Sequence, residues 1–367
     1  MALSKIPSAG FQDNVKFRNI IINGDMSIAQ RGTSFTGLSN GDSQYTLDRF
    51  KFQEAGAPTY QFTLSQDTDV PTGQGFAKSL KMDCTTAQSS LAAADGLRIE
   101  QRFEGQNLQY LKKGTSSAES LTLSFWVKSN KTGTYIAEIF DNDNSRQISK
   151  AYTINSASTW EKKTLTYAGD TSGSLDNDNS HSLDVRIWLG AGSNFTSGTL
   201  NTSWNSVTAA TRIVGQVNLA DSTSNEWYIT GVQLEAGTTA SDFEFLPHDV
   251  NLQRCQRYYF KWGVTQDNTS GSVYSFGTGG NTNDVAFLLI SPQIMRTFPS
   301  FTSSSLAVQD SVTQTNVTGL DSRESLSSSD RHFYVIHQTG SGSITQYRPY
   351  FATTSASSGY LAGDSEL

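Results

Sequence analysis

The stretch Leu121–Lys128, LTLSFWVK, alternates apolar and polar side chains along its length. Its leucines, phenylalanine and valine fall on one face of an extended chain, and its threonine, serine and lysine fall on the opposite face. The same alternation occurs in Leu183–Leu189, LDVRIWL, and in Phe76–Cys84. Strict alternation is typical of antiparallel strands that bury one face and expose the other.

Turn signals separate these segments at short intervals, as at Asn40-Gly41. Helical periodicity is scarce. It occurs in Gln106–Lys113 and in Asp249–Tyr258, with Asp249 as the predicted N-cap of the second stretch. Many short strands, frequent turns and little helix predict an all-β fold, an antiparallel β-sandwich or jelly roll.

Pro247 marks the predicted boundary between two folding units, because proline does not continue a central strand. We expect residues 1–18 to form an N-terminal arm, since they are polar and show no periodicity. Residues 19–247 then form the sandwich domain, and residues 248–367 form a second, smaller β-rich domain. Within this second domain, the polar stretch Ser303–Asp330 is predicted to be mainly a surface loop with a strand or two inside it.

Composition and charge argue against some classes of partner. The chain of 367 residues is 36% hydrophobic, 17% charged and 11% aromatic, with a net charge of −7. It has no basic stripe that could neutralise a phosphate backbone, so we expect no nucleic-acid partner. No apolar run approaches the roughly 18 residues of a membrane span, and the first residues lack the apolar core of a secretion signal, so we expect neither.

Cys84 and Cys255 are the two cysteines of the chain and lie far apart in sequence. A disulfide framework needs more cysteines, and a zinc site needs clustered ones. We therefore expect two buried free thiols.

Several segments together resemble a known family. They are NIIINGDMSIAQRG at Asn19–Gly32, RIEQRFEGQ at Arg98–Gln106, YITGVQLEAG at Tyr228–Gly237 and QRCQRYY at Gln253–Tyr259. In this order and at these intervals they are similar to a domain of tail-fibre and other appendage proteins of tailed bacteriophages. The resemblance covers about residues 19–260.

This resemblance implies a structural protein of the phage particle, assembled in the host cytoplasm and exposed on the particle surface or its tail. Its expected partners are other virion proteins, further copies of itself in a homotrimer, and polysaccharide on the host cell surface. The leading hypothesis is a tail-fibre or spike subunit that binds host glycans. The alternative is a capsid or neck decoration protein that acts through protein–protein contacts alone.

The central region is also similar in outline to jelly-roll carbohydrate-binding modules. Those modules typically open on a short strand with an acidic residue and close on a strand bearing a calcium-binding aspartate. In this chain Ser27 replaces the acidic residue of the opening strand, and Thr230-Gly231 replaces the aspartate of the closing strand. These differences argue against the structural calcium ion of those modules.

Glu100 and Glu104 form the most suggestive pair of carboxylates. On one strand they would lie about 13 Å apart at about 3.3 Å per residue, which is too far for the roughly 5 to 9.5 Å of a glycosidase pair. We expect an ion-pair patch with Arg98 and Arg102 instead. The four histidines have no nearby nucleophile signature either, so no catalytic residue is assigned and no enzyme is expected.

The pentapeptide DNDNS occurs twice and supplies the candidate metal ligands. These are Asp141 and Asp143 in the first copy and Asp176 and Asp178 in the second. Alternate carboxylate and amide oxygens suit calcium, but hairpin tips also favour aspartate and asparagine. The turn interpretation is preferred, calcium stays open, and no other cofactor is expected.

Three tryptophans are the candidate glycan-binding residues, because exposed aromatic rings stack on the faces of sugars. Trp126 and Trp188 lie opposite the clearest apolar rows of their strands, and Trp204 lies in the polar stretch Thr202–Ser206. Trp126 and Trp188 either line a second buried layer or form a surface platform, and for Trp126 the core or a subunit interface is the preferred place. For Trp204, a position in the core or an interface and an exposed position that binds a glycan are equally favoured.

Overall fold

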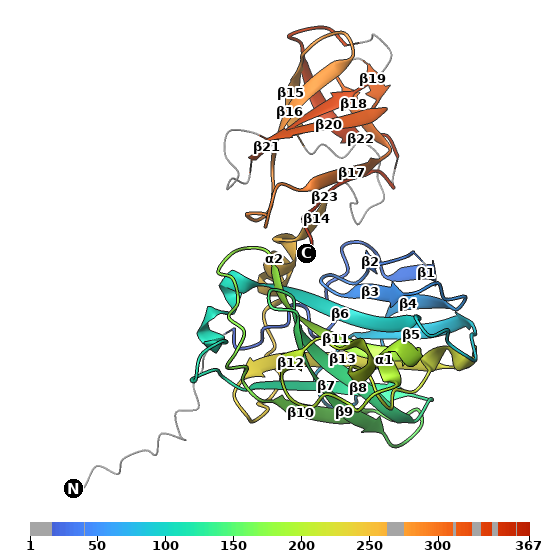
Figure 1. Ribbon diagram of the computed structural model, residues 1–367. Coiled ribbons are helices and arrows are strands. Elements are labelled where there is room, and N and C mark those ends of the chain that lie inside the picture. The colour runs from blue at the N-terminus through green and yellow to red at the C-terminus, as the bar shows by residue number, and fades with distance from the viewer. Residues whose placement is uncertain are drawn as a thin grey trace, which may run out of the picture.

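The computed structural model describes residues 17–39, 41–262, 275–310, 313–324, 332–339, 344–356 and 358–367. Most of the predicted N-terminal arm, residues 1–16, therefore lies outside the described residues. Figure 1 shows a sandwich built from the first part of the chain, a smaller β-rich unit above it, and helix α2 between them. Within the described ranges, no helix is long and apolar enough to span a membrane.

Two antiparallel sheets form the sandwich. The six-stranded sheet has the order β1 (Ser34–Leu38), β4 (Gln61–Asp67), β5 (Ser79–Thr86), β13 (Glu226–Ala236), β7 (Leu121–Ser129) and β10 (Glu161–Tyr167). The seven-stranded sheet has the order β12 (Asn205–Ser206), β9 (Arg146–Ile154), β8 (Gly133–Asp141), β11 (His181–Ala191), β6 (Gly96–Glu104), β3 (Lys51–Ala55) and β2 (Gln44–Tyr45). Short helices lie in the connections: η2 (Gly105–Asn107), η3 (Gln109–Leu111), α1 (Ser193–Thr196), η4 (Ala209–Thr211) and η5 (Leu219–Asp221).

The core of the sandwich lies between these sheets and follows the alternation in the sequence. On β7, Leu123, Phe125 and Val127 are fully buried. On β11, the inward residues Leu183 and Leu189 are also fully buried. The predicted all-β sandwich is therefore confirmed.

The second unit contains two further antiparallel sheets and follows α2 (His248–Gln256). One has the order β14 (Tyr259–Trp262), β23 (Tyr360–Asp364) and β17 (Ser300–Ser304). The other has the order β19 (Gln314–Asn316), β18 (Leu306–Gln309), β22 (Pro349–Thr354), β15 (Ser275–Gly279), β16 (Asp284–Ile290), β21 (His332–Gln338) and β20 (Gly319–Glu324).

Two local expectations for this unit are corrected. The stretch Ser303–Asp330 contains three complete strands, which the sequence did not resolve because strands of three to six residues are too short to show a clear alternation. Helix α2 has Pro247 at its N-cap position without a side-chain cap. Asp249 lies in the first turn instead, where the positive end of the helix favours its charge. Cys84 and Cys255 are buried free thiols, as expected.

The end of the chain returns from the second unit to the sandwich, and the C-terminal label in Figure 1 lies beside α2. Glu366 is buried against Arg49, whose side chain is completely buried, and against Arg31 at 3.4 Å. The main-chain oxygen of Leu367 accepts hydrogen bonds from Tyr45 at 2.7 Å and from Arg102 at 2.9 Å. The last residues thus connect the two units through buried charges.

Burial on its own would raise the pKa of the Glu366 carboxyl, and the guanidinium groups of Arg49 and Arg31 oppose that rise. A buried charge that has lost its partner is strongly unfavourable, because neither water nor a counter-ion stabilises it.

We expect Glu366→Ala to lower the free energy of unfolding by about 3 to 5 kcal/mol, because it leaves Arg49 buried without a counter-charge. Urea denaturation of the full chain measures this loss. Glu119→Ala is the matched control, because the Glu119 carboxylate is 39% exposed and pairs with the 54% exposed Lys112 at the surface. The control should cost at most about 1 kcal/mol, and equal effects of the two substitutions would contradict the assignment.

Candidate ligand-binding site

Glu100 and Glu104, the carboxylates singled out in the sequence, lie on β6 but have different partners. Arg98 Nε lies 2.7 Å and Arg102 Nη2 lies 2.8 Å from Glu100. Glu104 instead accepts two hydrogen bonds from Arg257, both at 2.7 Å. The predicted ion-pair patch is confirmed for Glu100 and wrong for Glu104, because α2 brings a guanidinium from 153 positions along the chain.

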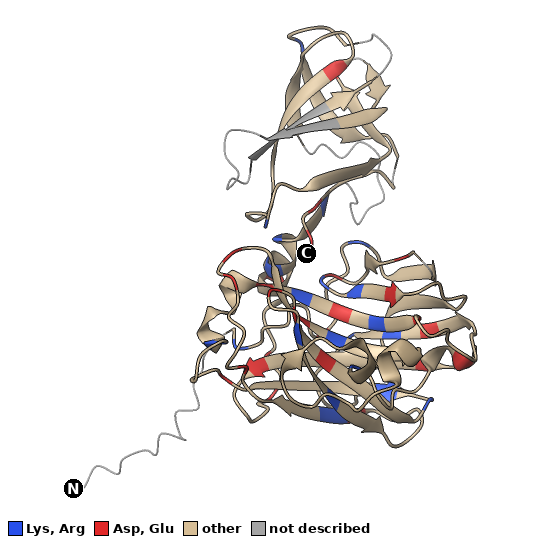
Figure 2. Cartoon of the chain, in the orientation of Figure 1, with Lys and Arg blue, Asp and Glu red and all other residues tan. Residues whose placement is uncertain are grey.

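Glu100 belongs to a lattice of ion pairs on the outer face of the seven-stranded sandwich sheet. Figure 2 shows basic and acidic residues alternating along β6. On β8, Glu138 accepts hydrogen bonds from Arg212 at 2.8 Å and from Trp188 at 3.0 Å. Arg186 lies 3.7 Å from both Glu100 and Glu138. The charges of this face therefore largely compensate one another.

The three candidate tryptophans are not brought together. Trp188 is fully buried beneath Phe195 and Ile213, so its ring has no free face for a sugar in this structure. Trp126 is partly buried on β7, in the other sheet of the sandwich.

Trp204 is packed partly against the main core, and its Nε1 donates a hydrogen bond to the carbonyl oxygen of Ala168 at 2.7 Å. The Lys113 ammonium lies 4.8 Å from the centre of the Trp204 ring. Its assignment as a glycan-binding residue stays a prediction.

The two DNDNS loops do lie side by side. The backbone N–H of Asp176 donates a hydrogen bond to the Asp143 carboxylate at 2.9 Å. However, Asp141 is paired with Lys113, and the Asp178 carboxylate accepts a hydrogen bond from the N–H of Ser180 at 2.8 Å. In the part of the chain that the structure describes, no group of three or more His, Cys, Asp or Glu side chains is arranged to hold a metal ion.

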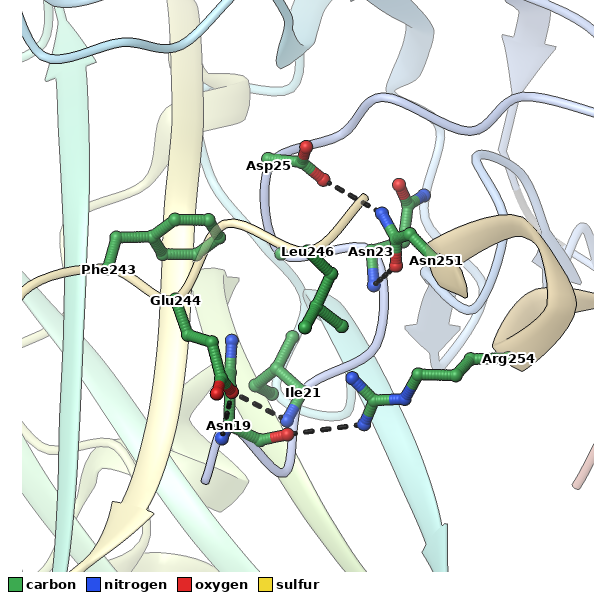
Figure 3. Close-up of a pocket in the computed structure, with 10 residues that line it drawn as sticks. Asn19, Ile21, Asn23, Asp25, Phe243, Glu244, Leu246, Asn251 and Arg254 are labelled. Carbon is green, nitrogen blue, oxygen red and sulfur yellow. Dashed lines mark hydrogen bonds between the residues drawn. The ribbon is translucent and has the colours of Figure 1, made fainter. Parts of the chain in front are cut away.

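A compact network of polar side chains joins the first residues of the sandwich to α2 (Figure 3). Asn23 has a positive φ of 61° and donates hydrogen bonds to the carbonyl oxygens of Ile28 and Asp48 at 2.9 and 3.0 Å. Its own N–H donates to Asn251 of α2 at 3.2 Å. The enclosed space measures about 10 Å³, enough for about one water molecule. The Asn-Gly-Asp motif therefore has a structural role here.

A much larger cavity, of about 250 Å³, lies beside this network. Its walls come from three segments. These are the residues before β1, the end of β6 together with η2 and η3, and α2 together with Arg257 and Tyr258, which follow it. The wall residues are Phe17, Asn19, Ile20, Ile22, Phe103, Glu104, Asn107, Leu108, Tyr110, Arg254, Arg257 and Tyr258. Phe103, Leu108 and Tyr258 are buried, while Phe17 and Tyr110 are about half exposed at the mouth.

Some polar groups of the cavity are fully committed to the protein. The Glu104 carboxylate binds Arg257 on both oxygens and also accepts hydrogen bonds from the Tyr258 hydroxyl and the Gln106 amide, each at 2.5 Å. The Asn19 side chain donates to the carbonyl oxygen of Val232 and accepts from two backbone N–H groups. These groups fix the walls.

Other polar groups are uncommitted. Among the described residues, neither the Tyr110 hydroxyl nor the Asn107 amide has a hydrogen-bond partner. Partial burial raises the pKa of Tyr110 to about 12, and the nearby positive charge of Arg254 opposes that rise. The hydroxyl is therefore a neutral donor at physiological pH. A cavity with aromatic walls and a few free donors is suited to a small polar ligand.

The sequence alone did not identify this cavity. Most of its wall residues lie in motifs that the resemblance had marked, but Asn107 and Tyr110 lie outside them, and no spacing rule brings these two together with Arg254. The one usable signal is the density of aromatic and arginine residues in QRCQRYY at Gln253–Tyr259.

No family model and no curated protein sequence matches the chain. Among solved structures it is similar to the enzymatically active domain of bacteriophage CBA120 tailspike protein 4, with 14% identity and a TM-score of 0.31, over 60% of this chain and 21% of that one. The chain thus spans about a fifth of the length of that tailspike chain.

The chain is also similar to carbohydrate-binding modules. For the family 11 module from Clostridium thermocellum in complex with a mixed-linked tetrasaccharide, the identity is 11% and the TM-score 0.28, over 57% of this chain and 99% of that one. For TmCBM61 in complex with β-1,4-galactotriose, the identity is 8% and the TM-score 0.24, over 60% and 99%. Likeness at this level does not indicate what the cavity binds.

The ion-pair lattice gives a prediction for the pH dependence of stability. Burial would raise the pKa of Glu100, but Arg98, Arg186 and Arg102 together lower it to about 2. Because the pKa of this group is lower in the folded than in the unfolded chain, its stabilising contribution is complete above about pH 4.5 and is lost as the pH falls towards 2.

We expect Glu100→Gln to lower the free energy of unfolding at pH 7, and the difference from the parent chain to shrink between pH 4.5 and 2. Urea denaturation at a series of pH values measures both effects. Glu119→Gln is the control, since Glu119 forms an exposed pair with Lys112 and should contribute less than about 1 kcal/mol throughout. A difference that is constant down to pH 2 would contradict the role of the Glu100 charge.

Proposed function

We propose that this chain is a structural subunit of a bacteriophage appendage that binds a sugar residue of the host surface polysaccharide in the cavity beside α2. The observation that carries the sugar-binding part is the cavity itself. It combines the aromatic rings of Phe17, Tyr110 and Tyr258 with the uncommitted donors of Asn107 and Arg254. Aromatic faces and a few convergent polar groups are what sugar recognition requires.

The size of the cavity supports a single sugar residue as the occupant. About 250 Å³ lies just below the roughly 300 to 1,000 Å³ of sites for drug-sized ligands. Its mouth is formed by the half-exposed rings of Phe17 and Tyr110, so the rest of a polysaccharide chain can extend into solvent. The walls are preorganised, because the Glu104 network holds Arg257 and Tyr258 in place.

The appendage part of the proposal is supported by the resemblance of residues 19–260 to phage tail-fibre proteins. In this role the chain contacts other virion proteins and is exposed on the phage particle. It performs no chemical step: Glu100 and Glu104, the carboxylates closest to a glycosidase pair, are occupied by arginines on different parts of the molecule.

An exposed apolar face supports self-association, within a trimer as in similar appendages. Phe276 of β15 and Phe351 of β22 are cross-strand partners with ring centres 5.2 Å apart, and they are 69% and 39% exposed. Leu288 and Ile290 of the adjacent β16 are each about half exposed. Water-exposed apolar groups of this size favour burial against a second copy. The same face would serve the alternative, a decoration protein that acts through protein contacts alone.

We expect Tyr110→Ala to weaken binding to a glycan array by about tenfold or more, because it removes one aromatic wall of the cavity. The full chain in its native oligomeric state is used. Tyr347→Ala is the control, since Tyr347 is 81% exposed in the second unit and far along the chain from the cavity. Full-chain protein that binds no glycan, or that binds equally well after Tyr110→Ala, would refute the proposed site.

We expect Phe276→Ser combined with Phe351→Ser to reduce the molar mass measured by light scattering after size-exclusion chromatography from that of a trimer to that of a monomer. Both side chains are exposed, so the fold of the unit should be retained. The variant Tyr347→Ser controls for the loss of an exposed aromatic ring elsewhere. A parent chain that is monomeric at micromolar concentration, or an unchanged mass in the double variant, would contradict the assignment of this face.

A further inference from the structure

Arg254 is a guanidinium of the cavity wall without a counter-charge. It lies in the last turn of α2 and makes one hydrogen bond, from Nη2 to the carbonyl oxygen of Asn19 at 3.2 Å (Figure 3). Within the described residues, no carboxylate oxygen lies within 4.0 Å of it. Its remaining N–H groups are available to a ligand in the cavity that it lines.

Arg257, the residue directly after α2, provides an internal comparison. Arg257 is paired with Glu104 through both Nε and Nη2, so its charge is compensated. The negative charge of Glu244 acts on Arg254 from a distance, but Glu244 forms no ion pair with it and does not line this cavity. Its two oxygens accept hydrogen bonds from the backbone N–H groups of Phe17 and Asn19. The cavity wall therefore carries one net positive charge at Arg254.

An uncompensated guanidinium in a partly enclosed site is energetically unfavourable, and burial lowers the pKa of Arg254 accordingly. An anion bound next to it recovers this energy, because charge-assisted hydrogen bonds are roughly twice as strong as neutral ones. The planar guanidinium is especially suited to carboxylate oxygens. The Tyr110 hydroxyl and the Asn107 amide are free to bind the neutral part of such a ligand.

We propose that the cavity is selective for a sugar residue that carries a single negative charge, as a carboxylate or a sulfate ester, and that Arg254 is the residue that binds this charge. The single uncommitted guanidinium matches a single negative charge. The inference rests on the proposed sugar-binding function and adds the class of sugar.

Matched pairs of methyl glycosides test the proposal by isothermal titration with the full chain. The probes are methyl glucuronide and methyl glucoside, methyl galacturonide and methyl galactoside, and 6-sulfated methyl galactoside, which separates a carboxylate from another monoanion. We expect the charged member of at least one pair to bind about tenfold more tightly than its neutral partner. This advantage should decrease as the salt concentration is raised.

The variant Arg254→Gln removes the positive charge but keeps a hydrogen-bond donor, so the charged and the neutral member of each pair should bind with equal affinity. Lys112→Gln makes the same change in net charge outside the cavity, on a side chain that is 54% exposed, and should retain the preference. Unfolding midpoints of both variants check that the fold is intact. Equal binding of charged and neutral sugars, or a preference that survives Arg254→Gln, would overturn this inference and leave sugar binding in place. Failure of every probe and of the glycan array would overturn both.

Discussion

The architecture depends on the burial of one positive charge. The Arg49 side chain lies completely inside the protein, with its guanidinium 3.5 Å from the centre of the Tyr258 ring and against the carboxylate of Glu366. Since such a charge is tolerated only with a counter-ion and hydrogen bonds, both partners must be in place. One partner follows α2 and the other follows β23, so the burial of Arg49 requires the second unit to lie against the sandwich, and the contacts of Tyr45 and Arg102 with Leu367 support the same arrangement.

The contacts of this junction also hold the walls of the cavity in place. The ring of Tyr258 contacts Arg49, and its hydroxyl donates a hydrogen bond to Glu104, which also binds Arg257. Asn23 and Asn251 fix the other side of α2. The segments that resemble phage appendage proteins therefore converge at one end of the sandwich. Most of their polar residues build the junction, and few are left free to meet a ligand.

The sequence predicted the parts of the fold in which local pattern and burial agree. Strands β7 and β11 were evident because each buries one complete row of apolar side chains between the two sheets. The strands between residues 306 and 324 were not, because they are only three to six residues long and two of them carry at most one apolar side chain. Trp188 lies on the outer face as expected, but the connection that carries Phe195 and Ile213 folds over it. The alternation of residues along a strand shows which face a side chain is on, but not whether another segment of the chain covers that face.

For the candidate site, the sequence supplied the motifs but not the arrangement. Glu104 was paired with neighbours on its own strand, whereas its partner is Arg257, directly after a distant helix. Arg254 looks identical to Arg257 in the sequence, three positions away in the same basic and aromatic stretch. Only the three-dimensional contacts distinguish the compensated arginine from the uncompensated one, and that distinction decides which of them can recognise an anion.

The return of the chain end to the sandwich also sets an order of events during synthesis. Arg49 and Glu366 are 317 positions apart, so the sandwich is translated in full long before its counter-ion emerges. Contacts of such high sequence separation form late and slowly. The ion pair between Arg49 and Glu366 is therefore among the last contacts of this junction to form. Until residue 366 is translated, the Arg49 guanidinium lacks the carboxylate that pairs with it in the folded chain.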